Sequence, residues 1–187
     1  MDISQIKAEV VTPETGIHVG DQTAPVKVMS FVNLRCPFCR EWNEKSKDVL
    51  TEYIQAGKIE LIIKPFDKEK ESLQRGNVTH RYLDYSKPEE TRETINKIYS
   101  KQDEWGSLTL PEVATYMESE LGLTEQDNKA ASEKIVAEAN AANVVFVPTV
   151  IVGEHIFDEH ISPEELRSLL DGELAKIKKS ECIGLKF

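Results

Sequence analysis

Apolar residues along the first part of the chain follow strand-like and helix-like patterns in turn. The run from Ala24 to Leu34 is rich in β-branched and aromatic residues and has Pro25 near its start, so it predicts a strand. After it, apolar positions among Glu and Lys indicate a helix that Gly57 ends. The apolar run from Lys58 to Phe66 predicts a second strand, buried on both faces. Strand, helix and strand of this length predict a βαβ unit with a right-handed crossover.

The pattern changes between residues 67 and 143, where charged residues and alanine dominate and apolar positions recur at helical spacing. We predict three or four short helices here, inserted into the α/β unit. For one of them, the stretch from Thr109 to Pro111 is a start signal and Gly122 a stop signal.

The remainder of the chain returns to a β-type pattern and closes with a helix. Two β-favouring runs between Phe146 and Phe157 surround a Gly-Glu pair, which predicts an antiparallel hairpin. A capping-box pattern that starts at Ser162 predicts a final helix that packs on the sheet.

The composition limits the classes of function. With 187 residues, the chain has the length of one domain or of a domain with an inserted subdomain. Its formal net charge of -10 at pH 7 repels phosphate backbones, so we expect no nucleic-acid partner. No segment has the length and apolar character of a signal peptide or a membrane span. We therefore expect a cytoplasmic location without membrane insertion.

Two cysteines, Cys36 and Cys39, follow the first predicted strand directly and open the first predicted helix. Free backbone N–H groups and the positive end of the helix dipole favour an anion at this place, so we expect a stabilised thiolate at Cys36. Pro37 suits the first helical turn because no hydrogen bond is lost there. Cys39 lies one turn further on, near enough to form a disulfide with Cys36. Such a pair can exchange two electrons through a mixed disulfide.

A metal site is the alternative for these two cysteines. Structural zinc needs four ligands, and the sequence offers neither a second CxxC pair nor two histidines at ligand spacing. An inert structural pair is the other alternative. We expect redox chemistry with no metal and no cofactor, and a free thiol at Cys182 near the end of the chain.

The stretch GDQTAPVKVMSFVNLRCPFC, from Gly20 to Cys39, and the Val-Pro-Thr sequence at residues 147–149 resemble the DsbA-like thiol:disulfide oxidoreductases of the thioredoxin superfamily. The order of the motifs matches from about residue 17 to about residue 172. The resemblance implies an α/β protein with the thioredoxin fold, in which helices flank a mixed central sheet, and an inserted α-helical subdomain. We assign residues 1–66 and 144–187 to the thioredoxin-like domain and residues 67–143 to the insertion.

The resemblance also implies roles for the residues of the Cys-Pro-Phe-Cys motif. Cys36 would be the attacking or attacked cysteine, and Cys39 would resolve the mixed disulfide. Pro37 and Phe38 would support the site. The partners would be protein or small-molecule thiols and disulfides.

Opposite the cysteines, the resemblance implies a cis-proline at Pro148. A cis X-Pro bond turns the chain sharply and can leave backbone groups of Val147 free to pair with an extended peptide. Val147 and Thr149 are therefore the expected substrate contacts, and Val147 and Pro148 support the active site. An ordinary proline at a strand edge is the alternative for this motif.

The sequence departs from the family pattern at two positions. Ser30 stands six positions before the first cysteine, where relatives often have a buried acid that handles the proton of the resolving cysteine. Phe38 stands in place of the histidine of the strongly oxidising Cys-Pro-His-Cys motif. These departures concern the proton relay and the oxidising strength of the pair.

Other functions of the same fold stay open at this point. An isomerase-like or glutathione-using relative is one, and a non-catalytic module that binds zinc or helps folding is another. For three further residues we expect a structural role and no part in the chemistry. Trp42 and Trp105 should pack in or near the core, and His80 should lie on the surface of a helix.

Overall fold

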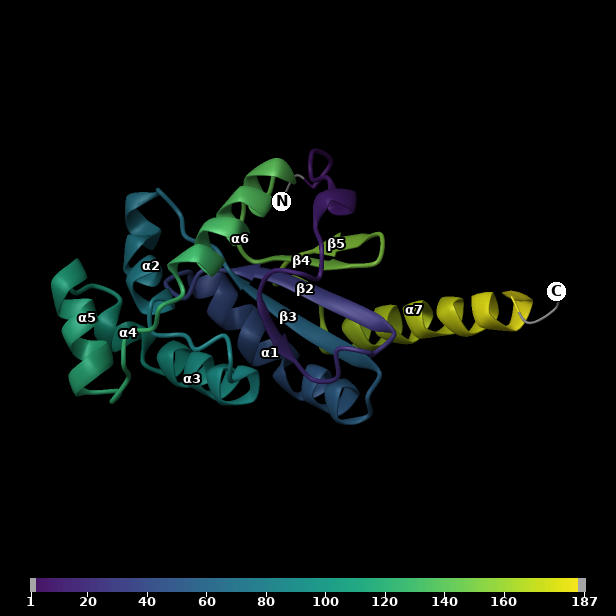
Figure 1. Ribbon diagram of the computed structural model, residues 1–187, viewed down its shortest axis with the longest axis horizontal. Helices are drawn as coiled ribbons and strands as arrows, with labels where there is room; N and C mark the ends of the chain where they lie inside the picture. Colours follow the sequence, from purple (N-terminus) through teal and green to yellow (C-terminus); the bar gives the residue numbers. More distant parts are fainter. Residues whose placement is uncertain (1–2, 185–187) are drawn as a thin grey trace.

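A mixed sheet of five strands, in the spatial order β1-β3-β2-β4-β5, forms the centre of the protein. The structure is a computed structural model that describes residues 3–184, with side chains described up to residue 180. Helices lie on both faces of the sheet, and the C-terminal helix projects beyond it (Figure 1). The strands are β1 (Ile17–Val19), β2 (Val26–Val32), β3 (Ile59–Pro65), β4 (Thr149–Val152) and β5 (His155–Phe157).

The predicted βαβ unit is confirmed. Strand β2 pairs in parallel with β3, and helix α1 (Pro37–Gln55) connects them. The predicted hairpin is confirmed as well, because β4 and β5 pair antiparallel and Gly153 between them has a positive φ of 57°. Strand β1, which pairs antiparallel with β3, was not predicted as a strand. With only three residues, it is too short to show a β-type pattern.

The segment between β3 and β4 contains helices joined by loops and no strand, as predicted, but it contains more helices than the three or four expected. Helix α2 is seven residues long and α4 only four, which is too short for a helical pattern to stand out in the sequence. The elements are the 3-10 helix η2 (Glu71–Leu73) and the α-helices α2 (Gln74–His80), α3 (Pro88–Ser100), α4 (Gln102–Trp105), α5 (Leu110–Ser119) and α6 (Lys129–Ala141). A 3-10 helix, η1 (Ala8–Val10), precedes the sheet.

Different helices cover the two faces of the sheet. Because side chains alternate along a strand, Val28 of β2 is buried on one face, together with residues of α1, α3 and α7 (Pro163–Gly184). Phe31 of β2 is buried on the other face, together with residues of α6 and of the N-terminal segment. Trp42 and Trp105 both lie in the core, as expected.

One hydrophobic cluster extends from the sheet into the inserted helices. It joins Val28 and Leu61 of the strands to Ile98, Trp105 and Met117 of the insertion. The helices between β3 and β4 therefore share a core with the thioredoxin-like part, and the division of the chain at residues 66 and 143 stays a prediction. Within residues 3–184, no helix combines the length and the apolar character that crossing a membrane requires.

A buried ion pair joins α6 to β3. The ammonium group of Lys64, which is completely buried, lies 2.7 Å from a carboxylate oxygen of Glu138. It also donates hydrogen bonds to the carbonyl oxygens of Thr12 and Thr15. Both charges are thus paired and hydrogen-bonded, as buried charges must be, and they hold α6 and the N-terminal segment against the sheet.

Candidate active site

The two cysteines lie where β2 ends and α1 begins. Cys36 is the N-cap residue of α1, Pro37 occupies the first helical turn, and Cys39 faces the core. Cys36 is 5% exposed and Cys39 is 0% exposed. Both are free thiols in the structure. The strand-to-helix position that the sequence predicts for the pair is therefore confirmed.

The helix start stabilises the thiolate of Cys36. Its sulfur accepts a hydrogen bond from the thiol of Cys39 and further ones from the backbone N–H groups of Cys39 and Phe38. Together these donors outweigh burial, which disfavours charge, and they lower the pKa of Cys36 from 9.0 to about 7. At neutral pH a large fraction of Cys36 is the reactive thiolate.

The surroundings of Cys39 have the opposite effect. Complete burial raises the pKa of this thiol, and the hydrogen bond to Cys36 and the charge of that neighbour raise it further. The backbone N–H of Asn33 lies 3.4 Å from the sulfur of Cys39 and lowers the pKa to a smaller extent. Cys39 is therefore a protonated donor, and Cys36 is the less deeply buried thiol of the pair.

The segment before β4 comes close to Cys36. The peptide bond between Val147 and Pro148 is cis, and the carbonyl oxygen of Val147 lies 3.4 Å from the sulfur of Cys36. Thr149 is completely buried and its hydroxyl donates to the carbonyl oxygen of Phe146. The side chain of Thr149 therefore does not face solvent, and the structure gives no support to its expected substrate contact.

Exposed apolar side chains occur on both of the segments that meet at Cys36. Phe38, between the two cysteines, is 54% exposed, and Val145 and Phe146, just before the cis peptide bond, are 62% and 49% exposed. Large exposed apolar residues gathered at one place commonly mark a binding surface. We call Phe38, Val145 and Phe146 the apolar rim.

Side chains from the insertion hold the turn at residues 33–36. His80 accepts a hydrogen bond from the backbone N–H of Leu34 at 3.2 Å, and Gln102 donates to the carbonyl oxygen of Leu34 at 2.7 Å. The other ring nitrogen of His80 lies 2.6 Å from a carboxylate oxygen of Asp67. His80 is only 3% exposed, so the expectation that it lies on a helix surface is wrong. Its partners are distant in sequence, which is why a local pattern could not place it.

Gly76 lets α2 approach this turn. A Cβ atom at this position would lie 2.8 Å from the backbone nitrogen of Arg35 and would also meet the side chain of Asn33. Asn33 itself donates to the carbonyl oxygen of Phe66, and its side-chain oxygen accepts from the N–H of Arg35. A side chain at Gly76 would therefore displace the turn that carries Cys36.

Sequence reasoning missed one buried acid near the pair. Glu159, which follows β5, is 8% exposed, and its negative charge raises the pKa of both Cys36 and Cys39. Ser30, which stands where relatives often have an acid, is also buried and accepts a hydrogen bond from the indole N–H of Trp42 at 3.1 Å. No motif marks Glu159, because the hairpin brings it to the site.

Within the part of the chain that the structure describes, the two cysteines do not belong to a group that could bind a metal. Among the described side chains, the one cluster with suitable geometry is formed by Asp158, Glu159 and His160, whose ligand atoms lie within 4.8 Å of one another. Cys182 belongs to the last turns of α7, and its side chain lies outside the described residues.

The lowered pKa of Cys36 predicts how its reactivity depends on pH. In a Cys182→Ser background, the alkylation rate of Cys36 should rise with pH, have its midpoint at about 7, and level off above it. Cys39→Ala removes the strongest hydrogen-bond donor, so it should move the midpoint upward. Stopped-flow alkylation over a pH series measures both. A midpoint near the ordinary thiol value of about 8.5 would contradict the assigned hydrogen bonds.

Gly76→Ala tests whether the insertion sets the geometry of the turn. The new methyl group overpacks the contact with Asn33 and Arg35, so the free energy of unfolding should fall by about 1–3 kcal/mol. The alkylation rate of Cys36 at pH 7 should fall as well, because the N–H groups that stabilise its thiolate shift.

Gly172→Ala in α7 is the matched control, because a Cβ atom at that position meets nothing within 4 Å. It should stabilise the protein by about 0.5–1 kcal/mol through helix propensity and leave Cys36 unchanged. Urea unfolding and alkylation kinetics compare the two variants. Equal effects of both substitutions would show that the contact of α2 with the turn is unimportant.

Comparisons with known proteins agree with this geometry. A family model described as thioredoxin matches residues 12–172. Among solved structures, a conserved protein of unknown function from Enterococcus faecalis is 55% identical, with a TM-score of 0.90, and the match covers 91% of this chain and 98% of that one. The comparison with curated proteins gives no match.

More distant solved structures share the fold. BdbD from Bacillus subtilis is 15% identical, with a TM-score of 0.59, over 91% of this chain and 96% of that one. A variant of alpha-DsbA1 from Wolbachia pipientis is 18% identical, with a TM-score of 0.66, over 90% and 96% of the two chains. The chain belongs to the thioredoxin family, and it shares its fold with DsbA-like proteins.

Proposed function

We propose that the protein is a thiol:disulfide oxidoreductase that works through the Cys-Pro-Phe-Cys motif. The family and the fold support this class of chemistry in general. The observation that carries the proposal is the contrast between the two thiols, since the pKa of Cys36 is lowered to about 7 while that of its hydrogen-bonded neighbour Cys39 is raised.

The proposed cycle uses both sulfurs. The thiolate of Cys36 attacks one sulfur of a substrate disulfide, forms a mixed disulfide and releases the other substrate sulfur as a thiolate. The sulfur of Cys39 then attacks Cys36, loses its proton, forms the Cys36–Cys39 disulfide and expels the second substrate thiol. The two protein thiols are oxidised and one substrate disulfide is reduced. In reverse, the same steps oxidise a substrate dithiol.

Two features favour protein or peptide partners over small thiols. The apolar rim offers exposed side chains beside the reactive sulfur. The carbonyl oxygen of Val147 lies close to Cys36, so the backbone here is within reach of a peptide bound at that sulfur. The substrate contacts at Val147 and the cytoplasmic location expected from the sequence are parts of this proposal.

The alternatives from the sequence have less support. A purely glutathione-dependent relative needs one nucleophile only, whereas a second thiol here is hydrogen-bonded to the first. A zinc-binding module needs further ligands, and the described side chains place no such group around the cysteines.

Trapping of the mixed disulfide tests the proposal. A Cys39→Ser, Cys182→Ser variant should form a lasting covalent adduct with a disulfide-containing peptide, because the serine cannot resolve it. Mass spectrometry should place the adduct on Cys36. The matched Cys36→Ser, Cys182→Ser variant should give no adduct, since Cys39 is buried and protonated.

The variant that keeps both active-site cysteines and carries only Cys182→Ser is the control. It should release the peptide as thiols and finish with a Cys36–Cys39 disulfide. The proposal fails if the adduct forms on Cys39, or if Cys36 forms none under conditions in which free cysteine reacts.

A further inference from the structure

The resolution step needs a destination for the proton of Cys39. This thiol is completely buried, and burial raises its pKa, so the proton does not pass directly to solvent. Ser30 carries no carboxylate that could accept it. The carboxylate of Glu159, the buried acid near the pair, lies 3.5 Å from the ring of His160, and among the described residues no hydrogen bond joins it to Cys39. A cavity beneath α1 offers another path.

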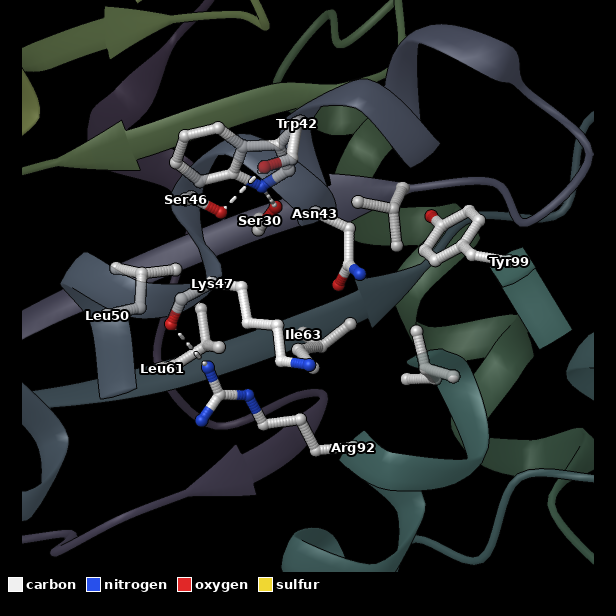
Figure 2. A pocket seen from close by; sticks show the side chains of 12 residues that line it. Ser30, Trp42, Asn43, Ser46, Lys47, Leu50, Leu61, Ile63, Arg92 and Tyr99 are labelled. Carbon is white, nitrogen blue, oxygen red and sulfur yellow. Dashed lines mark hydrogen bonds between the residues drawn. The ribbon is translucent and has the colours of Figure 1, made fainter. Parts of the chain in front are cut away.

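The cavity lies between α1, β2, β3 and α3, and Figure 2 shows the side chains that line it. The lining runs from exposed Lys47 and half-buried Arg92 at the surface to buried Ser30 and Tyr99 inside. The cavity has a volume of about 30 Å³. One water needs about 10–15 Å³ and two or more polar partners, so the space suits one or two waters.

Two buried polar atoms have no hydrogen-bond partner, one in a residue that lines the cavity and one in a residue bonded to the cavity lining. Among the described residues, the hydroxyl of Tyr99 and the side-chain nitrogen of Asn96 are the buried side-chain atoms in this condition. Tyr99 lines the cavity, and Asn96 accepts a hydrogen bond from Asn43, which also lines it. An unpaired buried polar atom costs roughly 1–3 kcal/mol, and ordered water commonly satisfies such atoms.

Tyr99 is also electrostatically coupled to the two cysteines. Burial raises the pKa of its hydroxyl. Negative charge on Cys39, and to a smaller extent on Cys36, raises this pKa further. Tyr99 therefore keeps its proton at neutral pH and acts as a hydrogen-bond donor. Asn43, which lines the cavity, follows Cys39 by one turn of α1, so the two side chains share a face of that helix and Cys39 lies next to the end of the cavity that holds Tyr99.

We propose that the cavity is a water-filled proton path, in which water held by Tyr99 takes the proton of Cys39 and passes it to solvent past Lys47 and Arg92. This inference rests on the proposed disulfide exchange. As Cys39 attacks the Cys36 sulfur of the mixed disulfide, the S–H bond breaks and its proton goes to this water. A proton leaves the water chain at the surface, and the substrate sulfur departs with the electron pair of the broken S–S bond. Tyr99 is a positioning residue, because it acts through the water.

Stopped-flow reaction with the aromatic disulfide dithiobis(nitrobenzoate) separates the two steps. Attack by Cys36 releases one coloured nitrothiobenzoate at a rate that depends on reagent concentration. Attack by Cys39 then releases the second at a rate that does not. All variants carry Cys182→Ser, so that only the active-site pair contributes.

Tyr99→Phe should slow the second phase about tenfold, as expected when one hydrogen bond is lost in the transition state, and leave the first phase unchanged. Asn43→Leu, which replaces a polar wall of the cavity by an apolar one, should also slow the second phase selectively. Tyr53→Phe is the matched control, because it removes a buried tyrosine hydroxyl that bonds to Asp171. It should leave both phases unchanged.

The outcomes test the proton path and the proposed disulfide exchange separately. An unchanged second phase in Tyr99→Phe overturns the proton path and leaves the proposed function intact. Equal slowing of both phases also overturns it, because the hydroxyl would then act on Cys36 or on the fold. If the parent protein with Cys182→Ser shows no reaction at Cys36 at all, the proposed function fails and the proton path falls with it.

Discussion

The turn at residues 33–36 is the constraint on which the site depends. It must leave β2 and enter α1 so that the first N–H groups of the helix point at the sulfur of Cys36. Three residues of the insertion fix this turn: His80 and Gln102 bond to the backbone of Leu34, and Gly76 leaves room for it. The inserted helices therefore contribute no reacting group, but they set the position of the one that reacts.

Once the turn is fixed, the different surroundings of the two thiols give them different pKa values. Cys36 lies at the helix end beside the apolar rim, where hydrogen-bond donors lower its pKa, whereas Cys39 lies one turn inside the core, where burial raises its pKa. The same geometry that makes Cys36 a ready nucleophile gives Cys39 a proton that is difficult to remove. The cavity at Tyr99 matters for this reason, since the fold offers polar groups there without a buried carboxylate at Ser30.

Local signals were sufficient to predict the βαβ unit, the hairpin and the position of Cys36 at a helix start, because each depends on neighbours in the sequence. Long-range contacts were not predictable in this way. His80 looked like a surface residue because its partners, Asp67 and the N–H of Leu34, meet it only after the insertion folds back. The burial of Thr149 was not predictable either, because it results from the pairing of β4 with β2; its expected substrate contact stays a prediction.

The equilibrium redox potential of the Cys36–Cys39 pair tests the account most directly. A thiolate pKa of about 7 resembles that of thioredoxin, about 7, and lies far above that of DsbA, about 3.5. Because stabilisation of the reduced thiolate makes a pair more oxidising, titration against dithiol buffers at pH 7 should show a reversible two-electron transition nearer to about −270 mV than to about −120 mV. A potential at or above about −120 mV, or no reversible transition involving both cysteines, would contradict the account.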